Sequence, residues 1–115
     1  MSQPAVTDAA SELGALSDAT RARIIELLAQ QDRCVCHLID DLELGQSIIS
    51  HHIGVLRRSS LVASYPHPRD RRWMYYRLNR DRLAEIGTAL VTLAATDDYN
   101  PARLPCPIDL EETAG

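Results

Sequence analysis

The sequence predicts a mainly α-helical fold with one β-hairpin, in the element order α-α-α-α-β-β-α. Residues 34–58 hold two short amphipathic segments separated by a break at Gly45, which is the pattern of a helix-turn-helix. Residues 61–78 hold two strand-like segments, and prolines lie in the connection between them. A hairpin that directly follows a helix-turn-helix is a wing. The predicted fold class is therefore a winged helix-turn-helix.

Helical periodicity also predicts the helices on either side of this pair. A first helix is expected over Pro4–Leu16, and Ser17 or Asp18 can cap a second helix that ends at residue 30. The buried stripe of that second helix is expected to be Ala22, Ile25, Leu28 and Ala29. Ser47 is a plausible cap for the second helix of the pair, and a last helix is expected over Asp81–Thr96.

The wing is predicted to consist of "LVASYP" (residues 61–66) and "RRWMYYRL" (residues 71–78). Pro66 and Pro68 cannot donate ladder hydrogen bonds, so the hairpin tip is expected to be irregular and exposed. Residues 1–96 are expected to form one domain. The tail, residues 97–115, holds three prolines and Cys106, and we expect it to be extended or disordered.

The distribution of charge favours contact with nucleic acid. The net charge of −4 argues mildly against it, but eight of the twelve arginines lie between Arg57 and Arg82, where only Asp70 and Asp81 oppose them. Arginines concentrated in this way are typical of phosphate contact, although a solvated basic face would look the same. No apolar run reaches membrane-spanning length and the N-terminus lacks a signal pattern, so we expect a cytoplasmic protein without a membrane partner.

The second helix of the pair is the expected reader of DNA. A helix of about 12 residues is about 18 Å long, which is enough to lie in one major groove. The residues expected to contact bases or phosphates are Gln46, Ser47, Ser50 and His51 in this helix, Arg57 and Arg58 at its end, and Arg69, Arg71 and Arg72 in the wing. For Gln46 and Ser47 the alternative is a role in helix capping alone.

Two cysteines, Cys34 and Cys36, lie where the first helix of the pair should begin, and an odd total of three cysteines does not fit a disulfide framework. On a regular helix, positions i and i+2 point about 200° apart. We therefore expect the two thiols to diverge, so that an ion bound by both would distort the first turn of the helix. The positive end of the helix dipole is expected to lower the thiol pKa.

These motifs together resemble the ArsR/SmtB family of bacterial winged-helix repressors. The resemblance covers roughly residues 8–96 and rests on the segments "LSDATRARIIELL", "CVCHL", "QSIISHHIGVLRRSSLV" and "RRWMYYRL". It implies a homodimer built on the first and last helices, which represses transcription at an inverted-repeat DNA operator until an inducer binds. It also implies that His52 packs structurally rather than contacting DNA.

The "CVC" segment resembles the metal box of the arsenic-sensing branch, but Ile39 stands where that branch carries a third cysteine. The resemblance implies trivalent arsenic or antimony as the inducer, with Cys34 and Cys36 as ligands and Cys106 as a candidate third ligand. Without Cys106, a two-thiol site would favour an organoarsenical. A cadmium-, lead- or zinc-responsive repressor and a thiol redox switch are the alternatives. No Gly-rich phosphate loop surrounds the thiols, so we do not expect an enzyme.

Overall fold

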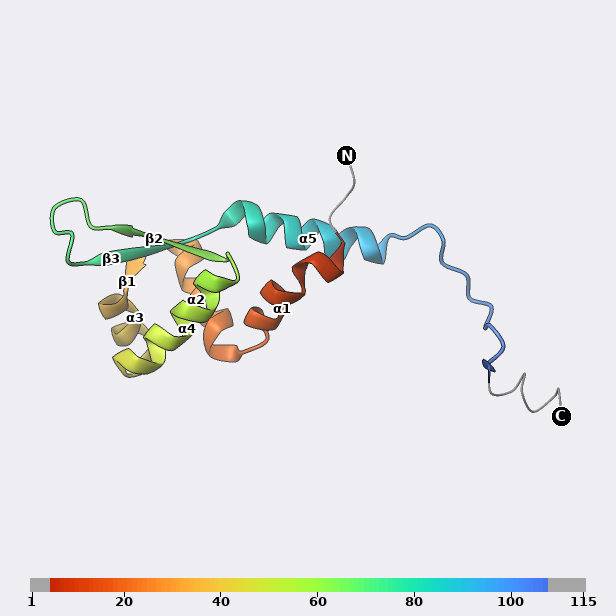
Figure 1. Cartoon of the computed structure of the whole chain (residues 1–115), viewed down its shortest axis with the longest axis horizontal. Coiled ribbons are helices and arrows are strands. Elements are labelled where there is room, and N and C mark those ends of the chain that lie inside the picture. Colours follow the sequence, from red (N-terminus) through yellow and green to blue (C-terminus); the bar gives the residue numbers. More distant parts are fainter. Residues whose placement is uncertain (1–4, 108–115) are drawn as a thin grey trace.

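The structure, a computed structural model, describes residues 5–107 and contains a helix-turn-helix followed by a β-hairpin wing (Figure 1). The elements in chain order are the 3-10 helix η1 (Val6–Ala9), α1 (Ala10–Leu16), α2 (Ala19–Gln30), β1 (Arg33–Cys34), α3 (Val35–Leu42), α4 (Gln46–Arg58), β2 (Val62–Pro66), β3 (Met74–Leu78) and α5 (Arg80–Ala94). The predicted fold class is confirmed, with η1 and β1 as additional elements. Pro4, the predicted start of the first helix, lies outside the described residues.

Polar caps set the starts of two helices. The Asp18 carboxylate accepts a hydrogen bond from the backbone N–H of Arg21 at 3.0 Å, and so begins α2 as predicted. Asn79 caps α5 in the same way. The predicted cap at Ser47 is wrong, because Gly45 has the extended backbone of an N-cap and the helix already begins at Gln46.

The sheet has three antiparallel strands in the order β1-β3-β2, so it is larger than the predicted hairpin. The two-residue strand β1 joins the free edge of β3, and Cys34 pairs with Tyr75. β3 begins at Met74 rather than at Arg71, because a turn occupies the preceding residues. In that turn the N–H of Trp73 donates to the carbonyl oxygen of Asp70 at 3.1 Å.

The core lies between the helix-turn-helix, α2 and the sheet. Its fully buried large side chains are Ile24, Leu28, Leu38, Ile49, Leu56 and Leu61. The buried stripe of α2 differs from the prediction, since Ile24, Ile25, Leu27 and Leu28 are buried whereas Ala29 is exposed. A helix that packs between α4 and the sheet buries a wider face than a single stripe.

Leu38 provides a test of this core, because its side chain is fully buried in α3. Leu38→Ala should lower the free energy of unfolding by about 2–5 kcal/mol, since it removes buried methyl groups and leaves a cavity. Urea denaturation followed by circular dichroism measures the loss. Leu104→Ala is the control, because Leu104 is exposed and should cost almost nothing. A loss equal to that of the control would contradict this core assignment.

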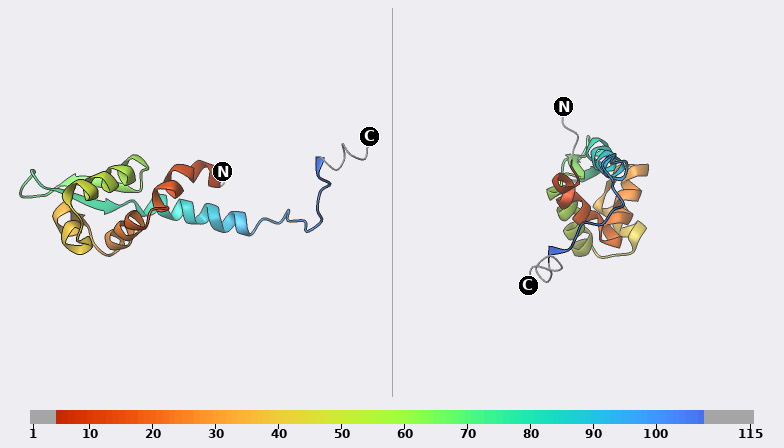
Figure 2. Two further views of the ribbon diagram at one scale, coloured as in Figure 1. Left: turned by 90° about the horizontal axis from the view of Figure 1, so that it is seen from below. Right: turned by 90° about the vertical axis from the view of Figure 1, so that its right-hand side faces the viewer.

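Helix α5 lies alongside η1, and the chain then runs away from the domain in an extended path (Figures 1 and 2). The Arg82 guanidinium links α5 to α1 by donating to the Glu12 carboxylate at 2.8 Å. Ile86 and Ala89 are buried, whereas Leu90, Val91 and Leu93 are exposed. The second half of α5 therefore presents an uncovered apolar face. No helix of the described residues is long and apolar enough to cross a membrane.

Candidate nucleic-acid interface and thiol pair

The two thiols of the "CVC" segment lie side by side. Cys34 is the N-cap residue of α3 and has an extended backbone, so it stands outside the helix that contains Cys36. Its Sγ atom lies 2.9 Å from Sγ of Cys36. The expectation that the thiols diverge is therefore wrong, because it assumed that both residues were helical. Cys34 is buried and Cys36 is exposed, so solvent reaches the pair from one side.

His37 supports this arrangement. Its Nδ1 accepts a hydrogen bond from the backbone N–H of Cys34 at 3.1 Å, which completes a capping box at the start of α3. The same Nδ1 lies 3.3 Å from Sγ of Cys34. Because Nδ1 accepts the hydrogen bond from the Cys34 backbone, it carries no proton to donate to the Cys34 sulfur. His37 therefore orients Cys34.

The pKa of the Cys36 thiol is raised, which is opposite to the expected effect of the helix dipole. The main cause is the hydrogen bond that it shares with Cys34, and desolvation adds to it. At neutral pH the site therefore presents a Cys36 thiol rather than a thiolate.

Helix α4 presents its polar side to solvent. Ile49, Ile53 and Leu56 are buried against the core, and this orients the opposite face outward. Gln46, Ser47, Ser50 and His51, the predicted reading residues, are all exposed on α4, as are Arg57 and Arg58 at its end. His52 is half-buried instead, and its Nδ1 accepts a hydrogen bond from the Arg21 guanidinium at 3.1 Å. This contact fits the structural role expected for His52.

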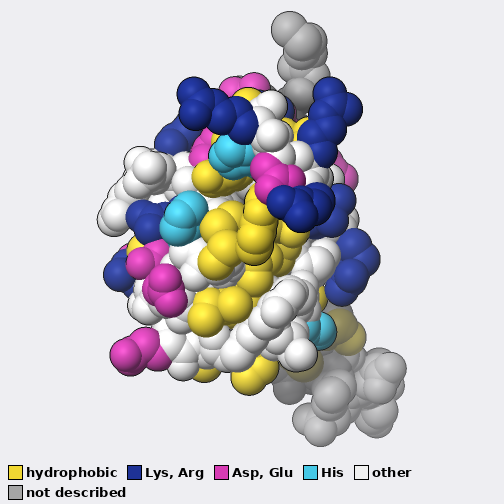
Figure 3. Space-filling model, turned by 90° about the vertical axis from the view of Figure 1, so that its left-hand side faces the viewer, with side chains coloured by type: hydrophobic (Ala, Val, Ile, Leu, Met, Phe, Trp, Pro, Cys, Tyr) yellow, Lys and Arg dark blue, Asp and Glu magenta, His cyan; other side chains and the backbone are white. Residues whose placement is uncertain are grey.

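The wing adds exposed arginines next to α4. Arg69, Arg71 and Arg72 are all exposed in the turn between β2 and β3. Arg72 is held by the Asp70 carboxylate in two hydrogen bonds of 2.8 and 3.0 Å, so it is the least available of the three. Figure 3 shows the end of the molecule that carries the wing, with apolar side chains at the centre and arginines around them.

Comparison with known proteins gives the family of this fold. A sequence model described as "Bacterial regulatory protein, arsR family" matches residues 18–64. An uncharacterized HTH-type transcriptional regulator of Methanocaldococcus jannaschii is 37% identical over 79 residues, which are 68% of this chain and 85% of the relative. The chain belongs to the ArsR/SmtB family. Since members of this family are DNA-binding transcriptional regulators, the chain is a regulator and not an enzyme.

Two further similarities place the chain within the family. The arsenic resistance transcriptional regulator ArsR2 of Pseudomonas putida is 37% identical over 86 residues, which cover 73% of this chain and 72% of that protein. Among solved structures, an ArsR-like transcriptional regulator from Rhodococcus sp. RHA1 superposes with a TM-score of 0.69 at 28% identity, covering 77% of this chain and 81% of the other. The winged-helix fold of the family is thus present here.

The third candidate ligand of this ArsR/SmtB-family regulator lies apart from the thiol pair. Cys106 is exposed on the extended tail beyond α5, whereas the pair lies near β1 at the opposite end of the domain (Figure 1). Within the described residues, no three His, Cys, Asp or Glu side chains are grouped so that they could hold one metal ion. One chain therefore brings two sulfurs together, and a contribution from the partner subunit's Cys106 stays a prediction.

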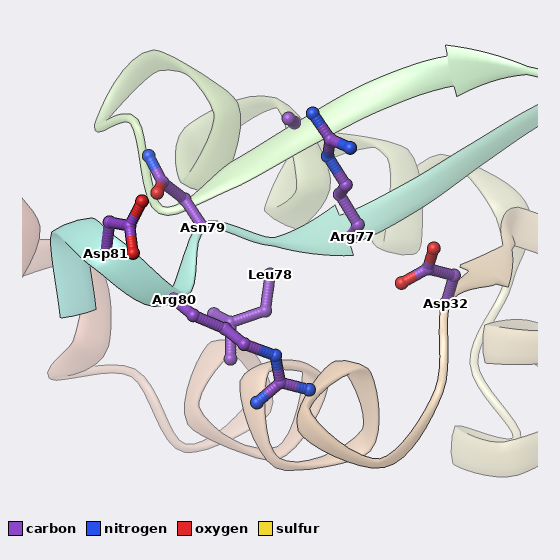
Figure 4. A pocket seen from close by; sticks show the side chains of 7 residues that line it. Asp32, Arg77, Leu78, Asn79, Arg80 and Asp81 are labelled. Atoms are coloured by element: carbon purple, nitrogen blue, oxygen red, sulfur yellow. The ribbon is translucent and has the colours of Figure 1, made fainter. Parts of the chain in front are cut away.

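Two hollows of this ArsR/SmtB-family regulator were not predicted from its sequence. One, of about 270 Å³, lies between Cys34, α4 and the wing, and Trp73 and Met74 form part of its wall. The other, of about 430 Å³, lies along the end of β3. In Figure 4 its Arg77 and Arg80 side chains point in different directions, and Arg80 donates to the carbonyl oxygen of Ala29 at 2.8 Å. The charged side chains of this second hollow therefore do not point toward one common binding position.

Proposed function

We propose that this protein is a homodimeric transcriptional repressor that leaves its operator when trivalent arsenic or antimony bonds to Cys34 and Cys36. The observation that carries the proposal is the 2.9 Å distance between the two sulfurs. Soft, thiophilic elements select sites made of sulfur. Here two sulfurs already lie close enough to bond to one such atom, and one of them faces solvent.

The position of Cys34 supports a route from the thiols to the DNA contacts. Cys34 pairs with Tyr75 of β3, which is the return strand of the wing, and it also begins α3 of the helix-turn-helix. An atom bonded to its sulfur therefore acts on both DNA-contacting units. Unwinding of the first turn of α3 is not required, because the sulfurs are together before the ligand arrives. By linkage, ligand and operator then weaken each other's binding equally.

The uncovered face of α5 supports the homodimer. Leu90, Val91 and Leu93 are large apolar side chains that are 44%, 69% and 61% exposed. Large apolar side chains left exposed together in one stretch of a helix are typical of a protein–protein interface. A second copy that buries it against its own α5 and η1 would hold two reading helices in a symmetric arrangement, which suits an operator with two half-sites.

Arsenic and antimony are favoured over cadmium, lead and zinc by the number of ligands. Zinc takes four protein ligands in a structural site, whereas no three His, Cys, Asp or Glu side chains of the described residues are grouped around one position. The arsenic compound arrives as a neutral hydroxide and forms two As–S bonds by releasing two water molecules. It therefore needs neither a deprotonated thiol nor a third protein ligand, in agreement with a Cys36 thiol whose pKa is raised.

The pH dependence of binding distinguishes a divalent cation, which releases thiol protons when it binds, from arsenite, which does not. A divalent cation must displace the proton of the Cys36 thiol, so its affinity should rise about tenfold per pH unit for each proton released. Arsenite releases water instead, so its affinity should be nearly constant. Operator release is measured by fluorescence anisotropy at pH 6.5 and 8.0, with arsenite and with cadmium, on a DNA fragment selected from a random pool with this protein.

Release by arsenite at equal midpoints at both pH values supports the proposal. Release by cadmium alone, with a midpoint that falls as pH rises, would identify a cation sensor and overturn it. A further arm with hydrogen peroxide, followed by dithiothreitol, tests the redox alternative. Release by peroxide together with no response to arsenite would replace ion sensing by a disulfide switch.

A further inference from the structure

The hollow beside the thiol pair lies between the thiol site, α4 and the wing, and it is open to solvent. It has a volume of about 270 Å³, and one of its walls is Cys34 itself. Its lining side chains come from the thiol site, α4 and the wing: Cys34, Val35, Gln46, Ser50, Arg72, Trp73, Met74 and Tyr76. A group that fills this hollow would therefore touch the thiol site, the reading helix and the wing at once.

The wing wall of the hollow carries two aromatic rings and a thioether, from Trp73, Tyr76 and Met74, beside the charged Arg72. Trp73 is 52% exposed and Met74 is 37% exposed, so two large apolar side chains of the wing are left open to solvent. Tyr76 adds a second half-buried aromatic ring. Aromatic and thioether side chains adapt well to an aromatic guest. For size, a cavity of about 150 Å³ is enough to hold benzene.

The thiol pair leaves one position of a trivalent arsenic atom unfilled. Cys34 and Cys36 supply two bonds, and no third thiol of the same chain is nearby in the described residues. A compound whose arsenic already carries one carbon substituent has two exchangeable positions, which matches two sulfurs. Because Cys34 lines the hollow, arsenic bonded to both sulfurs lies at its edge and can direct that substituent into it.

We propose that this hollow is a binding site for the organic substituent of a trivalent organoarsenical, and that it favours an aryl group over a methyl group. The proposal rests on the proposed function, because the arsenic atom must first bond to Cys34 and Cys36. In the binding step, an R–As(OH)₂ molecule forms two As–S bonds with the two thiols and releases two water molecules. Arsenic stays trivalent, and no oxidant or reductant takes part.

The substituent also explains how the ligand reaches the DNA contacts. Gln46 and Ser50 line the hollow on the side of α4, and both are predicted to read bases. An aryl group between them and Trp73 alters both the side chains that face the groove and the spacing between α4 and the wing. An aryl compound should therefore release the operator more fully than arsenite does at equal occupancy of the thiols.

The test compares methyl- and phenylarsenic(III), which bond to two thiols in the same way and differ only in the substituent. The full-length chain is titrated with each compound in the anisotropy assay. The midpoint for phenylarsenic(III) should be about tenfold lower, because the ring buries more apolar area than a methyl group does. Trp73 is the only tryptophan of the chain, so its fluorescence should change when the phenyl compound binds.

Trp73→Ala should bring the two midpoints together while arsenite still releases the operator, and Trp73→Phe should restore most of the preference. Trp73 is half-exposed, so neither change should unfold the domain. Equal midpoints in the unchanged protein, or a preference that survives Trp73→Ala, would overturn the aryl site and leave the proposed function standing. Failure of all three arsenicals to release the operator would overturn the proposed function itself.

Discussion

Cys34→Ser should abolish the response to arsenite and leave operator binding intact. In the unchanged protein we expect saturating arsenite to weaken operator affinity by about 100-fold, near the upper end of usual allosteric couplings. The variant should respond by less than about twofold, because one oxygen replaces one of the two adjacent sulfurs. Serine is a favourable N-cap residue, so α3 should begin at the same place and DNA binding should persist. Anisotropy titrations with and without arsenite measure both quantities.

Cys106→Ser is the matched control for this variant, since it makes the same chemical change on an exposed tail residue. If two sulfurs suffice, Cys106→Ser responds like the unchanged protein, and X-ray absorption counts two As–S bonds in both. Loss of the response in Cys106→Ser, with three As–S bonds in the unchanged protein, would instead assign the third bond to the tail. A Cys34→Ser protein that still releases its operator with arsenite would place the inducer elsewhere.

The elements that sequence reasoning predicted well are those set by local patterns. The polar face of α4 follows from the spacing of Ile49, Ile53 and Leu56, which fixes one buried side and therefore one exposed side. The start of α2 could be predicted because the Asp18 carboxylate can accept a hydrogen bond from the backbone three residues later. The proposed cap at Ser47 was wrong because Gly45, without a side chain to form a hydrogen bond, took that position through its backbone alone.

The geometry of the thiols depended on a contact that local patterns do not reveal. Cys34 is extended because it pairs with Tyr75, and a two-residue strand leaves no alternation in the sequence. Once Cys34 leaves the helix, the angle between it and Cys36 no longer follows helical geometry, and the two sulfurs meet. The hollow beside them has the same origin, since its walls come from three distant segments that the tertiary fold brings together.

The arginines of α4 and the wing should carry most of the dependence of operator affinity on salt. Replacing Arg57, Arg58, Arg69 and Arg71 together with alanine removes four exposed positive charges from the proposed interface. Removing one arginine–phosphate pair should reduce the slope of log affinity against log salt by about 0.9, so the slope should fall by roughly three to four. At about 0.15 M salt this corresponds to a loss of operator affinity of roughly a thousandfold. Anisotropy titrations at several salt concentrations give the slope.

Single substitutions then rank the contributions of individual arginines. Arg71→Ala should reduce the slope by more than Arg72→Ala, because the Asp70 carboxylate holds the Arg72 guanidinium at 2.8 and 3.0 Å and must release it before it can contact a phosphate. Arg103→Ala makes the same change of charge on the exposed tail, far from the wing, and should leave the slope unchanged. An equal effect of Arg71→Ala and Arg103→Ala would mean that net charge alone governs the affinity. In that case the wing would not lie against the DNA backbone.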